Sequence, residues 1–368
     1  MNRAVEISVL HSSTVRRDRG VEESSIELFR PASRFAVLAV VLAATLAGCT
    51  TDSEDAGPVT LRLGYFPNLT HATAILGVED GTFQQALGSS ATLEAARFTS
   101  GPPAVTAILS DAVDAVFIGA TPAVNAFLKT KGNVAIIAGA TSGGAQLVVR
   151  PGIETVADLK GKSIADPALG GAPDIALRYW LRQNGFQTGT AGDGDVHIVP
   201  QDNAQTAAAY AAGAIDGAWV PQPYAALLVS KGAHVLVNER TLWPDGKFNT
   251  TNLLVRSAFM KAHPDAVAAL LRGLVKETAA VNADPEQASR RANDAIAKIN
   301  GARLGAADLA AAWSDMTFTV DPLLGTVKEY ARRGAEVGVL ASGDLAGLAD
   351  LGPLNTALRA EGKSAVAE

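Results

Sequence analysis

The sequence contains little cysteine, few aromatic residues and no run of basic residues. Its 368 residues include one cysteine, and aromatic residues make up 5% of the chain. The net charge is −6, which argues against a nucleic-acid partner. Hydrophobic residues make up 48% of the chain, and charged residues make up 18%. A chain of this length and composition is ample for two globular lobes.

Motifs of several enzyme classes are also absent from the sequence. It contains no P-loop, no G-x-G-x-x-G fingerprint and no Ser-His-Asp arrangement around a nucleophile elbow. His197, His234 and His263 lie far apart and lack the spacing of metal ligands. We therefore predict neither a metal site nor a cofactor.

The N-terminal region holds an apolar run that is too short to span a membrane. Residues 35–46 (FAVLAVVLAATL) follow Arg30 and Arg34 and lead into the sequence LAGC, which ends at Cys49. This order suits a secretory signal peptide, and LAGC resembles a bacterial lipoprotein signal. We expect a leader over 1–48, lipidation of Cys49 and a polar tether over 49–58. Residues 1–29 fit no part of a signal peptide, and a misassigned start codon would explain them.

The most informative pattern is a unit that occurs twice. Residues 109–132 (LSDAVDAVFIGATPAVNAFLKTKG) and 211–232 (AAGAIDGAWVPQPYAALLVSKG) follow the same plan. Each copy predicts a buried strand, then a loop whose proline suits the first turn of the next helix. Asp114 and Asp216 hold matched places before the strands, which indicates turn or cap residues rather than an acid pair. A unit used twice predicts two similar lobes.

The predicted lobes are joined by a glycine-rich crossing. Strands are predicted over 134–140 and 145–149, and the link between them suits a hinge because glycine is free in φ. Lobe one is predicted over 59–142 plus 251–368, and lobe two over 143–250. From Pro264 onward the sequence predicts mainly helices, which include 264–282 and 285–299, and 345–358 closes the chain.

Six loops rich in small and polar residues follow the predicted strands. The carboxyl ends of parallel strands are where α/β sheets bind ligands, and helix N-termini there favour anions without Lys or Arg. If the two lobes face each other, all six loops can converge on one cleft. The loops are 67–71, 99–103 and 119–122 in lobe one, and 167–173, 200–203 and 221–223 in lobe two.

The candidate ligand-binding residues lie in these loops and at the crossings, and most have a structural alternative. Asn68, Ser100 and Thr121 are either hydrogen-bond donors to a ligand or turn and cap residues. His71 lines the mouth of the site or begins a helix, and Trp219 stacks on an apolar ligand tail or belongs to the core. Ser142 and Gly143 serve a ligand or the hinge. The full set is Asn68, His71, Ser100, Gly101, Thr121, Ser142, Gly143, Gly170, Gly171, Trp219, Gln222 and Thr250, with Asn249 beside the last.

Several stretches of the chain resemble one known family. They are LGYFPNLTHA at 63–72, GATSGGAQLVV at 139–149, IDGAWVPQPY at 215–224 and LWPDGKFNTTNLL at 242–254. Over roughly residues 59–358 the sequence resembles bacterial solute-binding lipoproteins of ABC importers, in the nitrate, sulfonate and taurine group. The resemblance implies an α/β fold with two lobes, periplasmic-binding-protein-like (type II). Each lobe is then a mixed, mainly parallel sheet flanked by helices, and a hinge joins them.

The resemblance also implies a function. The protein would be an extracytoplasmic, lipid-anchored monomer that binds a small anionic or zwitterionic solute, chiefly an aliphatic sulfonate. Its partners would be an ABC permease and its ATPase. Two alternatives are an enzyme acting on a sulfonated or pyrimidine-like compound, and a sensory lipoprotein. The thiamine-pyrimidine synthases and aromatic desulfinases that resemble this fold depend on cysteine, and no cysteine follows Cys49.

Overall fold

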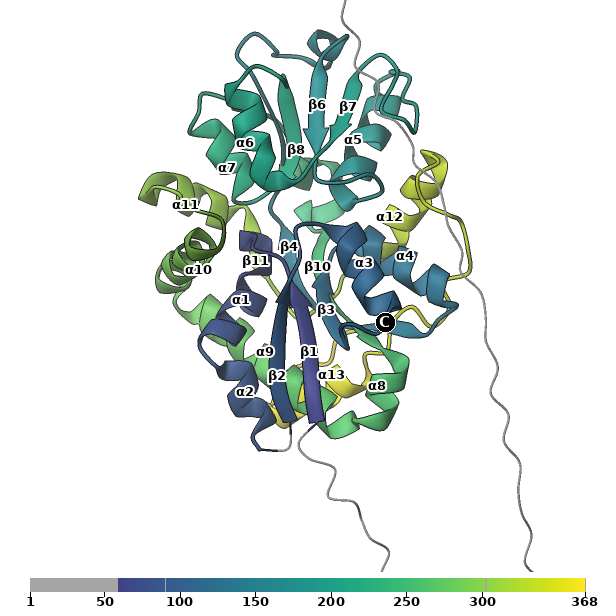
Figure 1. Ribbon diagram of the computed structural model, residues 1–368, viewed down its shortest axis with the longest axis vertical. Helices are drawn as coiled ribbons and strands as arrows, with labels where there is room; N and C mark the ends of the chain where they lie inside the picture. The colour runs from purple at the N-terminus through teal and green to yellow at the C-terminus, as the bar shows by residue number, and fades with distance from the viewer. Residues whose placement is uncertain (1–58, 90, 302, 368) are drawn as a thin grey trace, which may run out of the picture. The chain divides into compact units, whose positions relative to one another are not determined.

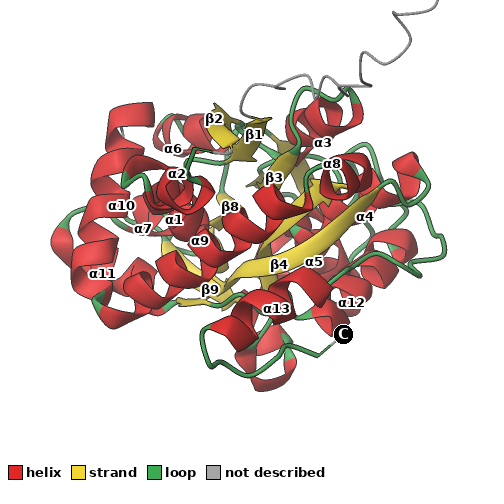
Figure 2. Ribbon diagram, turned by 90° about the horizontal axis from the view of Figure 1, so that it is seen from below, coloured by secondary structure: helices red, strands yellow, loops and turns green. Residues whose placement is uncertain are grey.

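The computed structural model of the protein describes residues 59–89, 91–301 and 303–367. The predicted leader, the tether and the lipidation site at Cys49 lie outside these residues. Among the helices in the described ranges, none combines the length and the apolar character needed to cross a bilayer. Two β-sheets form the framework, each with helices packed around it, and this arrangement confirms the predicted α/β fold class (Figure 1; Figure 2).

The first sheet has six strands in the order β11-β4-β10-β3-β1-β2. β1 pairs in parallel with β2 and β3, whereas β10 runs antiparallel between β3 and β4. This sheet is therefore mixed, as expected, and two of its strands arrive from late in the chain. The strands are β1 (Val59–Tyr65), β2 (Ala91–Arg97), β3 (Ala115–Ile118), β4 (Val134–Gly143), β10 (Asn249–Arg256) and β11 (Met316–Phe318).

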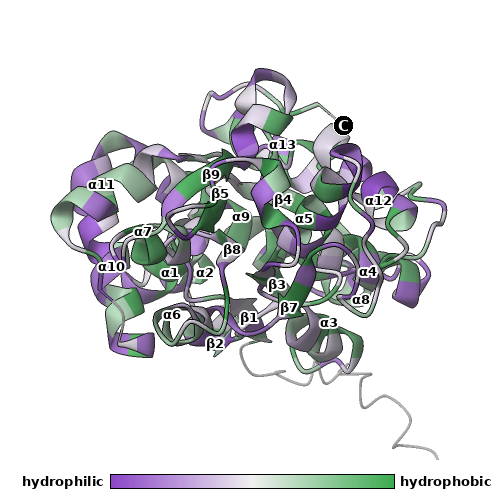
Figure 3. Ribbon diagram, turned by 90° about the horizontal axis from the view of Figure 1, so that it is seen from above, coloured by the Kyte–Doolittle hydropathy of each residue, from purple (hydrophilic) through white to green (hydrophobic). Residues whose placement is uncertain are grey.

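The second sheet has five strands in the order β7-β6-β8-β5-β9. β6 pairs in parallel with β7 and β8, and β5 runs antiparallel to both β8 and β9. β5 and β8 are apolar and pass through the interior, as their green colour in Figure 3 shows. The strands are β5 (Ala145–Val149), β6 (Ser163–Asp166), β7 (His197–Pro200), β8 (Gly217–Pro221) and β9 (His234–Asn238).

The helices divide between the two sheets. Around the second sheet lie α5 (Ala172–Gln183), α6 (Asn203–Ala211) and α7 (Tyr224–Val229). Near the first sheet lie α1 (Ala72–Glu79), α2 (Thr82–Leu87), α3 (Gly101–Leu109), α4 (Ala120–Thr130), α8 (Ser257–Ala262) and α9 (Pro264–Ala283). The C-terminal helices are α10 (Pro285–Asn300), α11 (Ala306–Ser314), α12 (Leu324–Glu336) and α13 (Gly352–Ala360). α12 packs against both α4 and α5, so it contacts both lobes.

The aspartate of the repeated unit makes the same backbone contacts in both lobes. The carboxylate of Asp114 accepts a hydrogen bond from the backbone N–H of Arg62 at 3.0 Å, and Asp216 accepts one from Ser163 at 2.9 Å. The backbone N–H groups of the two aspartates return bonds to the carbonyls of the same two residues. Each aspartate thus fixes the start of its repeat strand to a neighbouring strand. They act separately, in different sheets, as their matched positions predicted.

The crossing between the lobes is shorter than predicted. Thr141, Ser142 and Gly143 belong to β4, because β10 and β11 supply hydrogen-bond partners on both sides of it. Only Gly144 then separates β4 from β5, and both glycines have positive φ, +81° and +82°. A Cβ on Gly143 would lie 2.6 Å from both Arg240 Nε and the Asp315 carbonyl oxygen, so glycine is required there.

Other local predictions had mixed outcomes. The helices predicted over 264–282 and 285–299 are confirmed as α9 and α10. Prolines occupy their first turns, and Asp284 caps α10 by accepting from the Gln287 backbone N–H. Strands β9 and β11 were not predicted. The exact lobe boundaries predicted from sequence stay a prediction.

Candidate ligand-binding site

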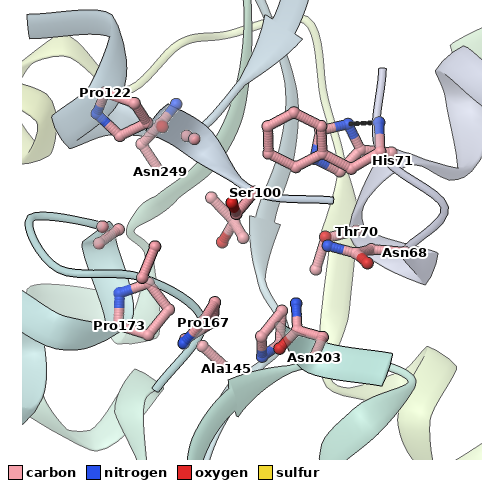
Figure 4. A pocket seen from close by; sticks show the side chains of 18 of the residues that line it. Asn68, Thr70, His71, Ser100, Pro122, Ala145, Pro167, Pro173, Asn203 and Asn249 are labelled. Atoms are coloured by element: carbon pink, nitrogen blue, oxygen red, sulfur yellow. Dashed lines mark hydrogen bonds between the residues drawn. The ribbon is translucent and has the colours of Figure 1, made fainter. Parts of the chain in front are cut away.

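A pocket lies between the two lobes, at the ends of strands from both sheets (Figure 4). Its wall includes the N-terminal residues or N-caps of four helices, α3, α4, α5 and α6. They reach the wall through Ser100 and Gly101, Gly119, Gly171 and Asn203. Each of these helices is at least nine residues long, and its N-terminus carries a partial positive charge. Four such ends around one space favour an anionic occupant.

Close packing brings two of these helices together. A Cβ on Gly101 would lie 2.9 Å from the ring of Pro122, so the absence of a side chain lets α3 approach α4. Prolines stand in the first turns of α3 and α5. A proline at these positions removes an N–H that the helix itself cannot pair. The wall therefore combines apolar rings with a small number of backbone donors.

Four polar side chains on the wall have no hydrogen-bond partner within the described part of the chain. Asn68 and Ser100 are N-caps, yet neither makes the side-chain bond that capping would provide. The four residues are 1–7% exposed, and the Oδ1 atom of Asn203 is fully buried without a partner. Buried polar groups are normally hydrogen-bonded, which makes an unpaired set in a pocket a candidate for ligand recognition. The four residues are Asn68, Thr70, Ser100 and Asn203.

His71 lines the same pocket in its neutral form. Its ring stacks on Phe66 with the centroids 4.6 Å apart, and Nδ1 accepts a bond from the Phe66 backbone N–H at 3.4 Å. Burial lowers the pKa of His71 to about 3. With Nδ1 acting as an acceptor, the ring proton is on Nε2, so His71 offers one neutral N–H donor.

Glu239 is an acidic residue on the opposite wall, and the sequence analysis did not single it out. It begins the 3-10 turn η3 (Glu239–Leu242) and is 1% exposed. Trp219 Nε1 donates to Oε2 at 2.8 Å, and Trp243 Nε1 donates to Oε1 at 3.3 Å. The Tyr330 hydroxyl, from α12, also donates to Oε1. Burial raises the pKa of Glu239 to about 7, against the opposing effect of these three donors.

The loop between β6 and α5 is held by a buried charged cluster. Asp166 accepts from the Ala168 backbone N–H, and Asp174 accepts from the Gly170 backbone N–H at 2.8 Å. Arg178 binds Asp174 at 2.5 Å inside the same cluster. Burial, with the neighbouring Asp174 carboxylate, raises the pKa of Asp166 well above its usual range. These groups fix the loop that presents Gly171 to the pocket.

The structure brings seven of the thirteen residues considered from sequence to the pocket wall. Asn249 is already bonded to Asn252 and to the Pro322 carbonyl, and the Thr250 hydroxyl donates to the Gly143 carbonyl at 2.6 Å. Among the described residues that line the wall, none is Lys or Arg. The seven are Asn68, His71, Ser100, Gly101, Gly171, Asn249 and Thr250.

Four of the other predicted residues, Thr121, Gly170, Ser142 and Gly143, join the lobes or support the crossing. The Thr121 hydroxyl donates to the Gly170 carbonyl at 2.9 Å, so a residue of α4 binds the loop of the other lobe. The Ser142 hydroxyl accepts from the Phe248 backbone N–H at 3.2 Å, beside Gly143.

The remaining two are Trp219 and Gln222, which lie behind the wall. Trp219 is 0% exposed and holds Glu239. The side-chain amide oxygen of Gln222 accepts a hydrogen bond from the Ala226 backbone N–H. The backbone carbonyl of Gln222 accepts one from the Leu69 backbone N–H, which belongs to the other lobe.

Several wall residues carried little or no sequence signal. Asn203 stood in a predicted loop without being singled out, and Thr70 stood inside the first predicted loop. Glu239 and Tyr330 come from η3 and α12, which were not predicted as elements of a site. Their contact joins residues 91 positions apart, and only the fold reveals such a pair.

Solved structures of similar fold include solute-binding proteins. The alkanesulfonate-binding protein SsuA from Xanthomonas axonopodis pv. citri, bound to MOPS, is 20% identical with a TM-score of 0.64, covering 78% of this chain and 96% of its own. The periplasmic nitrate-binding protein NrtA from Synechocystis PCC 6803 is 15% identical with a TM-score of 0.69. The match covers 82% of this chain and 89% of NrtA. A ligand-binding component of an ABC-type import system from Staphylococcus aureus, with zinc bound, is 15% identical with a TM-score of 0.67. The match covers 82% of this chain and 99% of that protein.

No curated protein matches the chain in sequence. One family model does match, over residues 54–297, which is more than half of the chain. The match begins just before β1 and ends within α10, so it includes both sheets except β11 and every wall residue named above except Tyr330. The chain therefore belongs to the NMT1-like family.

Proposed function

We propose that the protein is the extracytoplasmic solute-binding component of an ABC importer, and that its interlobe pocket captures a small oxyanion, an aliphatic sulfonate. One observation carries the proposal. The pocket joins four helix N-termini with buried, unpaired polar side chains and has no Lys or Arg on its described wall. Alkanesulfonate- and nitrate-binding proteins of the same fold support the choice of ligand.

Neutral donors suffice for useful affinity. A hydrogen bond to a charged group contributes about 1.5–3 kcal/mol, and a partly buried helix N-terminus contributes up to about 2 kcal/mol. Micromolar affinity requires about 8 kcal/mol. Bonds from Ser100, Asn68 and one helix N-terminus reach that value with an apolar contact to the alkyl part of the ligand. The wall rings of Phe66 and Pro122 provide such contacts.

A receptor fits the pocket better than an enzyme. The cysteine-dependent enzymes that resemble this fold need a thiol, and residues 59–367 contain none. Hydrogen bonds across the lobes, from Thr121 to Gly170 and from Leu69 to Gln222, fit lobes that close on a solute. We infer a hinge motion at the crossing on ligand release, and delivery to a membrane permease driven by an ATPase.

Cys49 lies outside the described residues, and we propose it as the lipid anchor of a monomeric receptor. Its place after an apolar run and the residues LAG supports this. Cys49→Ser should abolish incorporation of labelled fatty acid and release the protein from the membrane fraction. Equal labelling of the serine variant would disprove the anchor.

The binding proposal is tested with the full-length chain by calorimetry against ethanesulfonate, nitrate, sulfate and a pyrimidine. We expect one ethanesulfonate to bind per chain. At 100 times its dissociation constant the ligand should add about 2.7 kcal/mol to the free energy of unfolding. Small-angle scattering should show a smaller radius of gyration at saturation. If no oxyanion binds, or if only the pyrimidine binds, the proposal is wrong.

A further inference from the structure

Glu239 is a buried acid on the wall of a pocket that we propose to hold an anion. It is 1% exposed, it begins η3, and it lines the same space as Asn68 and Ser100. An ionised carboxylate would repel an oxyanion in this space, because charges removed from water are weakly screened. A protonated carboxyl would not repel it. The charge state of Glu239 therefore decides how well the pocket accepts an anion.

No cation touches this carboxylate within the described ranges. None of the salt bridges found there includes Glu239. Arg240, its neighbour in the chain, donates to the Asp315 carbonyl instead. The guanidinium of Arg333 lies over the Trp243 ring, 3.9 Å from its centroid, and attracts the carboxylate from a distance rather than by contact. A buried charge without a contacting counter-ion is costly, so the surroundings favour the protonated form.

The strands and turns packed around Glu239 bring it no further charge. β5 has no titratable side chain, and the indoles of Trp219 and Trp243 only donate. His234 of β9 bonds to a backbone carbonyl outside the pocket. Asp245, in the turn after Trp243, is exposed. The remaining element is α12, which supplies the distant guanidinium described above and one phenol.

Glu239 is the group on the described wall whose charge changes near neutral pH. Burial raises its pKa to about 7. His71 is neutral because burial lowers its pKa to about 3, and burial beside Glu239 raises the pKa of Tyr330 well above its usual range. An anion in the pocket would raise the pKa of Glu239 further, because it repels the ionised form. Binding of the anion is then linked to binding of a proton.

The Tyr330 hydroxyl lets Glu239 take this proton without losing a hydrogen bond. A phenol hydroxyl can donate or accept, and Tyr330 donates to Oε1 of the ionised carboxylate. When Oε1 carries the proton, its O–H donates to the phenol oxygen instead. The phenol hydrogen is then free to turn to an acceptor in the pocket, which Tyr330 also lines. One contact thus serves both charge states of Glu239.

We propose that Glu239 is a proton-binding site coupled to the anion site, so that the pocket takes up an oxyanion together with one proton. The proposal rests on the proposed function, because it assumes that an oxyanion binds in this pocket. The proton comes from the solvent, since an alkyl sulfonate is itself fully ionised. The anion and the proton together add no net charge to the pocket.

The test measures proton uptake by the full-length chain directly. Sodium ethanesulfonate is added to saturation in weakly buffered solution at pH 6 and at pH 8, and the acid needed to hold the pH is titrated. With a pKa of about 7, Glu239 is about nine-tenths ionised at pH 8 and about one-tenth ionised at pH 6. We expect uptake of more than about 0.5 proton per bound ligand at pH 8, and of less than about 0.2 at pH 6.

Two variants assign the proton to its residue. Glu239→Gln has a neutral side chain at every pH and should take up less than about 0.1 proton per bound ligand at pH 8. Glu277→Gln removes a buried glutamate of α9 that lies outside the pocket and whose pKa burial also raises. It is the matched control, and it should keep the full uptake.

Calorimetry at the two pH values gives a second readout. Amine buffers are used, because sulfonate buffers would compete for the pocket. Affinity of the wild type for ethanesulfonate should fall up to about tenfold from pH 6 to pH 8, as the ionised fraction of Glu239 rises. In Glu239→Gln the affinity should change less than about twofold over the same range.

Two outcomes overturn the inference separately from the proposed function. If ethanesulfonate saturates the protein at pH 8 without proton uptake, the two sites are not coupled, although the pocket still binds sulfonates. If Glu239→Gln takes up as much proton as the wild type, another group holds the proton. If ethanesulfonate does not bind at either pH, the proposed function itself is wrong, and the inference falls with it.

Discussion

The two walls of the pocket differ in how their polar side chains are paired. On the side of the six-stranded sheet, Asn68, Thr70 and Ser100 are buried without a hydrogen-bond partner among the described residues. On the side of the five-stranded sheet, Asn203 is also unpaired, but the acidic residue Glu239 is held by three donors. The first wall therefore presents hydrogen-bond donors that have no partner. On the second wall, the Glu239 carboxylate is an acceptor whose orientation is fixed by its three donors. The difference makes the first wall the better candidate for holding the anionic group of the proposed ligand.

The largest expected effect concerns the second wall and the stability of the ligand-free protein. The pKa of Glu239 is raised to about 7 from an unfolded value near 4.5, so the folded state keeps a proton that the unfolded state releases. The stabilisation is complete below pH 4.5 and is lost as the pH rises through 7. Between pH 5 and pH 8 this group should lower the free energy of unfolding by about 2.5 kcal/mol.

Urea unfolding of the wild type and of Glu239→Gln at both pH values measures this effect. Burial also raises the pKa of Glu277 and of Asp315, so these groups contribute to the pH dependence of both proteins. The contribution of Glu239 is therefore the difference between the two proteins in how the free energy of unfolding changes with pH. If the free energy of unfolding changes with pH equally in the two proteins, burial does not raise the pKa of Glu239.

The next effect concerns the first wall. Ser100→Ala removes one hydroxyl that makes no bond to the described chain, so the fold should be unchanged. Affinity for ethanesulfonate should fall roughly 5- to 100-fold, because a donor to the sulfonate is lost. Ser110→Ala, at the exposed C-terminal end of the same helix, is the control and should bind normally. Unchanged affinity in Ser100→Ala would mean that Ser100 does not hold the sulfonate.

A smaller effect concerns the contact that joins the walls. Thr121→Val keeps the shape of the side chain and removes the bond to the Gly170 carbonyl. If this bond forms only when the lobes are closed, its loss should weaken every ligand about 2- to 10-fold. Thr130→Val, at the other end of α4, removes a bond within the helix and serves as control. Unchanged affinity in Thr121→Val would show that the contact does not contribute to closure.

The smallest expected effect is that of His71. Burial lowers its pKa to about 3, so the ring stays neutral from pH 6 to pH 8.5. In the Glu239→Gln background, affinity for ethanesulfonate should change less than about twofold over this range. A tenfold loss as the pH rises would mean that a charged His71 holds the anion.

The sequence predicted the parts of the molecule that depend on local pattern. The two repeats, the α/β class and the loops that reach the pocket follow from periodicity, from the positions of glycine and proline, and from a family resemblance. Asn68 and Ser100 were named as candidates because small polar residues stood where strands end. These features involve residues that are close in sequence.

The acceptor wall depends on distant contacts and could not be predicted. Glu239 follows β9, whose short, half-buried pattern gave no clear strand signal. Its partners Trp219 and Tyr330 lie 20 and 91 residues away. Thr121 was considered as an anion donor because it begins a helix, but its hydroxyl meets a carbonyl 49 residues later in the other lobe. Such pairings are decided by how the lobes close.

The central claim is that neutral donors of the first wall hold the anionic group. A crystal structure of the full-length chain with ethanesulfonate tests it most directly. We predict sulfonate oxygens within about 3 Å of Ser100 Oγ and the Asn68 amide, beside the N-termini of α3 and α4. A sulfonate bound to a Lys or Arg side chain, or bound outside the pocket, would contradict the account.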